Sequence, residues 1–386
     1  YRTLEAYDRL LENEYTWDKA KVQTEREADD RLMLLEGWIP TAEAQSLESA
    51  LDRGDYYCRK LEISDEDDIP IELKNNRFNR LFEPITRLYS LPNAHEFDST
   101  PLFAPFFMLF FGICFGDGGY GLLLLLLGTL MKRKAKADMK PILSLLQCFG
   151  IATLVVGTLS GSFFGVNIAE IPALASVKRY FLTSDNIMTL SLVIGFIHVL
   201  YGKFVAAMKV KVQRGLKYSL AAFAWVFLIL ALALAVGLPM MNIHLPQPVV
   251  YALYGVAGLG ALIAFFYNSP GKNVFLNFGS GIWATYNTAS GLLGDTLSYI
   301  RLYAIGLTGS LLGGVFNTMA VDMTATMPIW VRWLPMLLIL LVGHALNIGL
   351  SMVSSLVHPM RLIYVEYYKN SEFEGGGTAY APFRKI

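Results

Sequence analysis

The sequence predicts a mainly α-helical, multi-pass membrane protein with a small α+β portion at its N-terminal end. Of its 386 residues, 54% are hydrophobic and only 17% are charged, whereas soluble domains carry about 25% charged residues. The apolar residues form long blocks, as in helices that span a bilayer. Most acidic residues lie before residue 100, and later charges fall mainly in short loops. We therefore expect two domains, residues 1–98 and residues 99–386.

The N-terminal domain is expected to be water-exposed. Residues 1–31 alternate apolar and charged side chains at helical spacing, which predicts one arm of a long solvated helix or of a helical hairpin. Two predicted strands, 32–40 and 56–64, flank a helix that begins with Thr41 as its N-cap. The chain begins with Tyr1 inside the charged helical pattern, so we expect an upstream part.

Eight apolar blocks make up the predicted membrane domain: 102–116, 119–131, 141–166, 187–208, 218–237, 248–267, 292–321 and 333–368. The sequence FGDGGYG separates the first two blocks, and glycine favours turns over helix. We interpret residues 102–131 as a re-entrant hairpin that turns there; one continuous helix with a glycine packing patch is the alternative. The stretch 271–291 is polar and glycine-rich, and we place it at a membrane surface.

Short basic loops predict the orientation of the blocks. Residues 132–140 and residues 203–217 hold five Lys or Arg residues each, so both loops are expected in the cytoplasm. Residues 238–247 and 322–328 hold none and are expected outside. This pattern places the N-terminal domain and the C-terminus in the cytoplasm.

Two arginines, Arg301 and Arg361, lie inside the last two apolar blocks. An arginine at membrane depth costs at least ~2.5–3.5 kcal/mol on insertion scales, so such a charge faces protein, water or an ion path. Both lie ~12–14 Å along antiparallel helices from the expected cytoplasmic face, and they can line one site. Arginine keeps its proton but makes a passing carboxylate release one. We therefore expect ion translocation rather than bond-making, with the ion-binding carboxylate on a partner chain.

Polar neighbours of the arginines leave alternatives open. Asp295 and Ser298 share nearly one helical face with Arg301, so this arginine could instead pair structurally with Asp295 or with a backbone carbonyl. Arg361 could snorkel to the cytoplasmic interface beside Glu366.

His358, one turn before the second arginine, could relay protons near neutral pH or bond two helices. We expect His198 and His344 to be packing histidines. A polar side of the last helix could wet a half-channel or hold helices together; it consists of Asn347, Ser351, Ser354 and Ser355. Small residues suggest the close approach of another helix at Gly306, Gly309, Gly313 and Gly314.

The sequence carries no catalytic or metal-site pattern. The GKN at 271–273 lacks the spacing of a phosphate loop, and there is no zinc spacing, nucleophile elbow or dinucleotide fingerprint. The cysteines are odd in number and two lie in apolar segments, so neither a disulfide framework nor a metal site is expected; they are Cys58, Cys114 and Cys148. We expect no cofactor and no nucleic-acid partner.

Four segments carry a family resemblance: PFFMLFFGICFGDGGYG, LLGDTLSYIRLYAIGL, HPMRLIYVEYYKN and GGGTAYAPF. In this order they resemble subunit a, also called subunit I, of V-type and archaeal-type rotary ATPases, over essentially the whole chain. The resemblance implies an eight-helix stator domain beside a rotating ring of c subunits. It also implies two long, tilted last helices, each with an arginine that faces the ring carboxylates. These arginines match Arg301 and Arg361, and their accompanying histidine and glutamate match His358 and Glu366.

The resemblance further implies partners and a location. The partners are the c-ring (proteolipid) subunits, the peripheral stalk and central-stalk-cap subunits, and the lipid bilayer. ATP synthesis or hydrolysis would take place on other subunits, with no ATP-hydrolysing site on this chain. The short loops suggest a prokaryotic cell membrane. Eukaryotic members have a glutamate, a histidine and an acid where this chain has Ser351, Gly309 and Asn287, so their half-channel residues are not carried over.

A self-contained, ion-coupled secondary transporter is the alternative function. Its arginines would bind an anionic substrate. The chain lacks the strong internal repeat of many such transporters, and its charged helical arm suits a stalk. Both features favour the stator. The sequence leaves open whether protons or sodium ions move.

Overall fold

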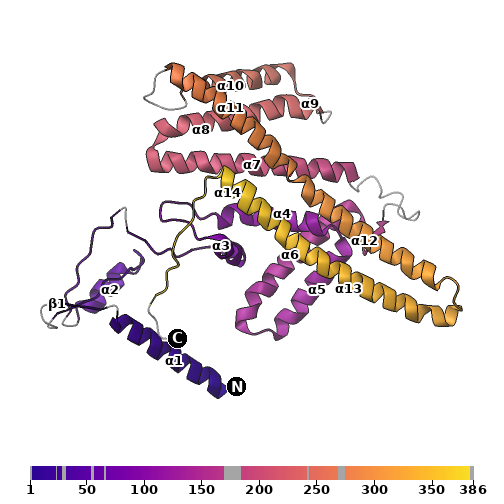
Figure 1. Cartoon of the computed structure of the whole chain (residues 1–386), viewed down its shortest axis with the longest axis horizontal. Helices are drawn as coiled ribbons and strands as arrows, with labels where there is room; N and C mark the ends of the chain where they lie inside the picture. The colour runs from indigo at the N-terminus through magenta and orange to yellow at the C-terminus, as the bar shows by residue number, and fades with distance from the viewer. Residues whose placement is uncertain are drawn as a thin grey trace. The chain divides into compact units, whose positions relative to one another are not determined.

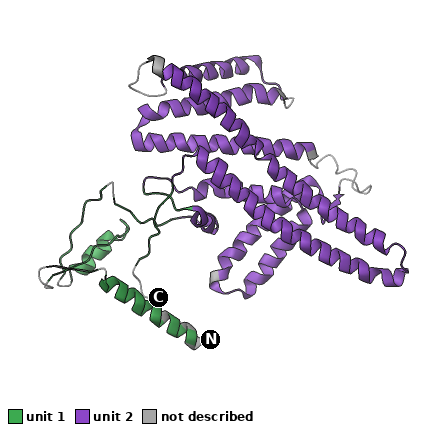
Figure 2. Ribbon diagram, viewed as in Figure 1, with its two compact units in different colours: residues 1–74, 90–94, 375–386 green, residues 75–89, 95–374 purple. Residues whose placement is uncertain are grey.

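The protein is described here from a computed structural model (Figure 1). The structure describes residues 2–22, 24–27, 32–53, 56–64, 67–168, 184–240, 243–267 and 274–382. The predicted mainly α fold class is confirmed. The chain forms two compact units (Figure 2), and the smaller one consists of Tyr1–Lys74, Ser90–Ala94 and Gly375–Ile386. The domain boundary that we expect at residue 98 stays a prediction.

The smaller unit contains two helices and one short strand pair. Its elements are α1 (Arg2–Val22), β1 (Glu25–Glu27), β2 (Leu32–Leu34) and α2 (Ala44–Leu51). The two strands run antiparallel. The C-terminal segment joins this unit through β-bridges of Ala379 with Ile71 and of Gly377 with Leu91.

Three predictions for this unit need correction. The strand expected at 32–40 is only three residues long. The residues expected as a strand at 56–64 form none, because they pair with no other described segment. Helix α2 has Glu43 rather than Thr41 as its N-cap, because residues 41–43 form a turn in front of it.

The larger unit begins with η1 (Asn79–Phe82) and α3 (Glu83–Tyr89), followed by α4 (Thr100–Phe115), α5 (Gly118–Lys134) and α6 (Lys140–Ser160). Helix α6 packs against both α4 and α5. The phenylalanines of α4 form the centre of the core, and five of them are fully buried: Phe103, Phe107, Phe110, Phe111 and Phe115. Helix α4 is therefore covered by protein on most of its sides.

A helix break separates α4 from α5, as the FGDGGYG sequence predicts. Gly116 adopts a left-handed φ of 62° that ends α4, and glycine adopts this conformation without a Cβ penalty. Asp117 is the N-cap of α5 and accepts hydrogen bonds from the N–H groups of Gly119 and Tyr120 at 2.9 and 3.1 Å. One continuous helix over 102–131 is therefore wrong, whereas a re-entrant path through a membrane stays a prediction.

The next elements are β3 (Ser162–Phe163), β4 (Val166–Asn167), α7 (Ser184–Arg214), α8 (Leu216–Leu232), the π-helix η6 (Ala233–Gly237), α9 (Leu238–Met240), α10 (Gln247–Phe266) and α11 (Val274–Leu297). Helix α8 packs between α7 and α10, and α10 packs on α11 (Figure 1). The stretch 271–291 is helical from Val274 onward, and residues 271–273 lie outside the described residues. Close packing explains this helix despite its glycines, because a Cβ at Gly281 would lie 3.0 Å from the Phe265 backbone.

The chain ends in two long helical segments. Helix α12 (Ile300–Thr324) is followed by α13 (Ile329–Arg361), which continues into the π-helix η7 (Leu362–Tyr367) and α14 (Tyr368–Asn370). Helices α12 and α13 lie side by side, and both contact α4 (Figure 1).

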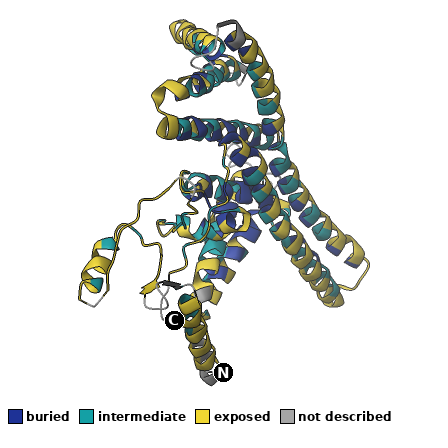
Figure 3. Ribbon diagram, turned by 60° about the vertical axis from the view of Figure 1, so that its left-hand side comes forward, coloured by how far each residue is buried: buried dark blue, intermediate teal, exposed yellow. Residues whose placement is uncertain are grey.

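Many apolar residues of the larger unit are exposed, and Figure 3 shows exposed residues along its outer helices in yellow. Six helical segments among the described residues are long and apolar enough to cross a membrane by length and composition. They are Lys140–Ser160, Asp185–Arg214, Leu216–Gly237, Gln247–Phe266, Asn277–Thr324 and Ile329–Asn370. The protein is thus an integral membrane protein, while the predicted count of eight spans is not confirmed.

Candidate functional site

The helical backbone is irregular next to both predicted arginines. Arg301 follows a two-residue turn, Ser298 and Tyr299, that separates α11 from α12. Across this turn the N–H of Tyr299 bonds the carbonyl of Thr296 at 3.1 Å, a spacing tighter than that of an α-helix. Arg361 is the last residue of α13, directly before the π-helix η7. Such interruptions of an α-helix often occur at functional sites.

Arg301 has an unsatisfied charge. One of its terminal nitrogens, Nη1, is buried and has no hydrogen-bond partner among the described residues. A buried donor without a partner costs ~1–3 kcal/mol, and more when it is charged. The structural pair of Arg301 with Asp295 that we left open is wrong, because Asp295 is held by other residues.

Asp295 instead connects α11 to α14. Its carboxylate accepts two bonds from Lys369 Nζ, at 2.9 and 3.2 Å, and one from Asn370 Nδ2 at 2.7 Å. Asn370 also donates to the carbonyl oxygen of Glu366 at 2.6 Å. This ion pair holds the break before Arg301 close to the π-helix after Arg361.

Glu366 and His358 meet Arg301 at the same place. Glu366 is buried, and its oxygen Oε2 has no partner in the described part of the chain. Ser298 and Arg301 are the polar groups that act most directly on its carboxylate. His358 lies within electrostatic range of both arginines, and its Nδ1 is likewise buried without a described partner. The structure therefore brings together a charged site of Arg301, Glu366, His358 and Ser298.

Arg361 acts on the charged site through His358. Its side chain is on the exposed side of α13, between the exposed Val357 and Val365. Glu366, five residues later, is buried. The alternative in which Arg361 snorkels to the cytoplasmic interface beside Glu366 stays a prediction. Arg361 stands as a cation on an otherwise apolar helix face.

Asn347 and Ser351 belong to a second polar group, which we call the Tyr120 network. Asn347 Nδ2 donates to Tyr120 Oη at 3.0 Å and to the Gly309 carbonyl oxygen at 2.8 Å. Ser351 Oγ donates to Asn347 Oδ1 at 3.3 Å. Tyr120 Oη lies 2.6 Å from His344 Nδ1, which it can bond as donor.

The Tyr120 network continues to α12. His344 Nε2 lies 3.1 Å from Asn317 Oδ1, and Asn317 Nδ2 donates to the Phe164 carbonyl oxygen at 2.7 Å. We expected His344 to be a packing histidine, but it also makes two hydrogen bonds in this network. The small residues of α12 make room for this network, because a Cβ at Gly313 would lie 3.2 Å from Tyr120 Oη. The predicted close approach at the α12 glycines is confirmed.

Ser354 and Ser355 complete the polar side of α13. Ser354 is half-buried. Ser355 is fully buried, lies one turn after Ser351, and its hydroxyl has no partner among the described residues. Hydrogen bonds thus satisfy the Tyr120 network, whereas the polar groups from Ser355 to Glu366 are partly unsatisfied.

Asp117 organises the region beside the Tyr120 network. The carboxylate is fully buried and accepts bonds from the N–H groups of Phe164 and Gly165 at 2.9 and 2.8 Å. Ser162 Oγ lies 3.0 Å from the same carboxylate and 2.8 Å from Ser310 Oγ. With the two α5 N–H groups already described, five donors surround this acid.

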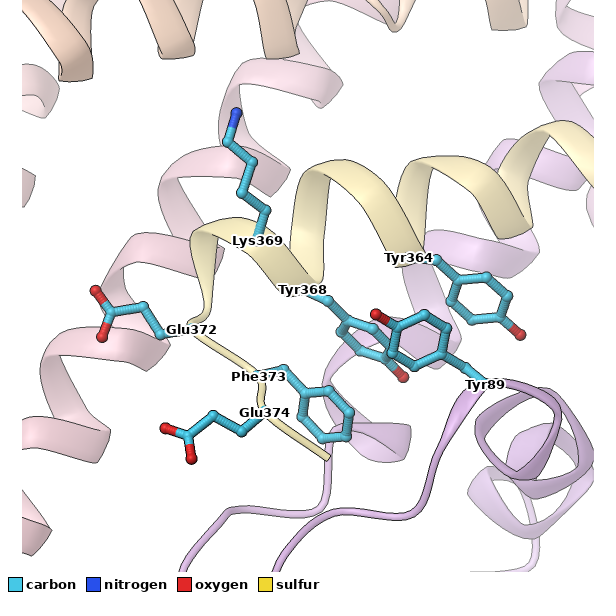
Figure 4. Close-up of a pocket in the computed structure, with 7 residues that line it drawn as sticks. All are labelled: Tyr89, Tyr364, Tyr368, Lys369, Glu372, Phe373 and Glu374. Atoms are coloured by element: carbon cyan, nitrogen blue, oxygen red, sulfur yellow. The ribbon is translucent and has the colours of Figure 1, made fainter. Parts of the chain in front are cut away.

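An aromatic pocket of about 310 Å³ lies at the end of α14 (Figure 4). The rings of Tyr368 and Phe373 stack at 4.4 Å, and Tyr89 stacks on Tyr364 at 4.7 Å. Tyr364 Oη donates to the Ile85 carbonyl oxygen at 2.7 Å. These contacts anchor the last helix to α3. In Figure 4 the Lys369 side chain points away from the stacked rings.

The comparisons with known proteins agree on one kind of subunit. The model of the V-type ATPase 116kDa subunit family matches residues 21–149. The A-type ATP synthase subunit I of Methanocaldococcus jannaschii is 28% identical over 92% of this chain and 55% of its own length. The V-type ATP synthase subunit I of Borreliella burgdorferi is 29% identical over 98% of the chain and 64% of its own length.

The resemblance to subunit I of V-type and A-type ATP synthases is confirmed. A further relative, the A-type ATP synthase subunit I of Pyrococcus abyssi, is 28% identical over 99% of the chain. The chain spans 55%, 64% and 58% of the lengths of these three subunit I relatives.

Sequence reasoning missed several residues of the two polar groups described above. Lys369 and Asn370, which hold Asp295, lie in the segment HPMRLIYVEYYKN that carries the resemblance. Tyr120 lies in the FGDGGYG sequence, where only the glycines drew attention. Asn317 gave no signal, because one amide in an apolar helix is common in packed bundles.

Proposed function

We propose that this chain is the stator membrane subunit of a rotary V/A-type ATPase, in which Arg301 faces the carboxylates of a ring of c subunits. The observation that carries the proposal is the buried, unpartnered Nη1 of Arg301. Asp295, the acid expected to neutralise it, is occupied by Lys369 and Asn370. Glu366 lies within electrostatic range of this charge, but no described residue bonds Nη1, and a carboxylate of the ring would give the arginine a further anionic partner.

The chemistry of such a site is ion exchange. A ring carboxylate that approaches Arg301 is favoured in its ionised form, because the guanidinium keeps its charge at any accessible pH. It therefore releases its ion before it passes. The same fixed charge repels a free cation and so blocks a direct leak. His358 and Glu366 are placed to receive or deliver the ion beside Arg301.

The Tyr120 network offers a route on the other side of Arg301. Counted along α13, it begins at Ser351, about 10 Å from His358 at 1.5 Å per residue. The buried Ser355 hydroxyl lies between them without a described partner. We assign the network to one half-channel, and the Glu366 and Asp295 side to the other.

Arg361 contributes a second positive charge on the face of α13 that would meet the ring. Packing of an apolar helix does not require such a charge. The position of Arg361 between the exposed Val357 and Val365 leaves it open to a partner. The proposed partners are therefore the c-ring and, for the N-terminal unit, the stalk and central-stalk-cap subunits. The proposed location is a prokaryotic cell membrane with both ends of the chain in the cytoplasm, and ATP would be turned over on other subunits.

The first prediction tests Arg301 directly. Arg301→Ala should lower ATP-driven ion pumping by at least about 100-fold, the effect of removing one charge-stabilising donor. Arg301→Lys should also fail largely, because lysine lacks the planar fork of donors and can lose its proton when buried. Pumping is measured by a pH-sensitive dye, or a sodium-sensitive one, in vesicles that contain the assembled complex.

Co-purification of a small, very apolar ring subunit serves as the assembly control. A transporter that works alone would purify without such a ring. Normal pumping by an assembled Arg301→Ala complex would falsify the proposed function.

A further inference from the structure

His198 of α7 contacts two tyrosines beside the charged site. One lies close to Arg301 in the sequence, and the other directly follows Glu366. Its Nδ1 lies 2.7 Å from Tyr299 Oη, in a buried hydrogen bond. Its ring stacks on Tyr367 with centroids 4.8 Å apart and an interplanar angle of 14°. Tyr299 precedes Arg301 by two residues, and Tyr367 directly follows Glu366.

The Tyr299 ring is enclosed on several sides. It is fully buried, and Phe110 of α4 meets it edge-on at 5.5 Å. A Cβ at Gly195, one turn before His198 on α7, would overlap the Tyr299 ring carbons. Gly195, His198 and Phe110 therefore surround the Tyr299 ring, and we call them the Tyr299 socket.

The socket lies at the turn that separates α11 from α12. Tyr299 belongs to the two-residue turn between these helices and has no side-chain capping bond. Its ring is thus the contact that sets the direction of the first turn of α12, where Arg301 stands. Because His198 also stacks on Tyr367, the same contact sets the position of the π-helix that carries Glu366.

We propose that His198 and its Tyr299 socket are positioning elements that hold Arg301 and Glu366 in register with each other. This inference rests on the proposed function for its effect on pumping, and on the geometry alone for its effect on the helix break. His198 touches neither charged residue through a described hydrogen bond, so it acts through the two tyrosines.

Gly195→Ala is the sharpest variant, because its added Cβ must displace the Tyr299 ring. We expect ATP-driven pumping to fall by about ten- to hundredfold, the usual loss when reacting groups are misplaced by about 1 Å. Gly258→Ala on α10 is the matched control, since a Cβ there meets no atom within 4 Å. It should pump normally.

A second readout separates positioning from general damage. Spin labels at Tyr286 on α11 and Leu311 on α12, both exposed, report the distance across the break by pulsed electron paramagnetic resonance. Gly195→Ala should shift or broaden this distance, and Gly258→Ala should not. Loss of pumping with an unchanged distance would overturn the positioning role.

Milder variants decide the question if Gly195→Ala fails to assemble. His198→Asn keeps a hydrogen-bonding group near the position of Nδ1, whereas His198→Leu removes it. We expect His198→Leu to lose pumping and His198→Asn to recover more than half of that loss. Equal activity of the two would overturn the inference. If Arg301→Ala also pumps normally, the proposed function itself fails; if only the socket variants pump normally, this inference alone fails.

Discussion

At the scale of single residues, the charged site combines three charged or titratable side chains that each have an unsatisfied polar atom. Arg301 Nη1, His358 Nδ1 and Glu366 Oε2 are all buried without a partner among the described residues. Asp117, by contrast, is equally buried and has five donors. Buried polar groups without partners are rare in proteins and usually mark a function.

Arg361 gives a second prediction at this scale. The Arg361 side chain is exposed and bonds no described residue. Its proposed role therefore depends on its positive charge more than on the planar shape of the guanidinium. We expect Arg361→Lys to keep a substantial part of ATP-driven pumping, clearly more than Arg301→Lys keeps. Arg332→Lys is a control at the other end of α13, where Nε donates to Thr324. Equal losses for both arginine sites would contradict the different roles assigned to them.

The sequence predicts which residues matter better than which residues touch. Arg301, His358 and Glu366 stand out because charged groups are rare in apolar blocks, and the structure groups them. The pairing of Asp295 could not be predicted, since it depends on a partner 74 residues later. Arg361 and Glu366 lie five residues apart across the start of the π-helix, where the structure exposes the first and buries the second.

At the scale of elements, α12 is shaped by its contacts with α4. A Cβ at Gly306 would overlap the carbonyl oxygen of Ile113, and Gly116 lies against Gly306 in the same contact. Both helices therefore approach with backbone against backbone. Of the four small residues expected to allow a close approach, Gly306 makes this contact with α4, whereas Gly313 and Gly314 lie against Gly165.

Gly306→Ala provides the third prediction. The added methyl meets rigid backbone rather than a movable side chain, and overpacking of this kind costs ~1–3 kcal/mol. The purified protein in detergent should unfold at a lower temperature, measured by intrinsic fluorescence or by loss of the monodisperse peak after heating. Gly258→Ala faces open space and should be neutral or slightly stabilising, as expected for alanine in a helix. An unchanged unfolding temperature for Gly306→Ala would show that α4 and α12 can separate freely.

Several element boundaries could not be predicted from composition. The stretch 271–291 reads as polar, yet α11 is helical there because it packs closely on α10. The strand expected at 56–64 has β-branched and aromatic residues but no neighbouring strand to pair with among those described. Local preference indicates a strand only where a partner supplies the hydrogen bonds.

At the scale of the whole molecule, orientation in the membrane rests on the basic loops. A cysteine at Lys134, the exposed last residue of α5, should react with an impermeant maleimide only from the cytoplasmic side. A cysteine at Gln247, exposed at the start of α10, should react only from outside. The exposed Cys58 must first be replaced so that it does not contribute to the signal. Reversed labelling would defeat the assignment of both ends of the chain to the cytoplasm.

The five-donor cradle of Asp117 has a consequence for how the protein is made. On the predicted re-entrant path, the α4–α5 turn would enter the membrane during synthesis before its partners exist, since Gly165 follows Asp117 by 48 residues. At ~5–20 residues per second, the carboxylate waits about 2–10 s for those donors. An aspartate without partners in a lipid-facing helix costs ~2.5–3.5 kcal/mol. We therefore expect the release of α4 and α5 into lipid to be timed by the emergence of α6 and the β3–β4 hairpin.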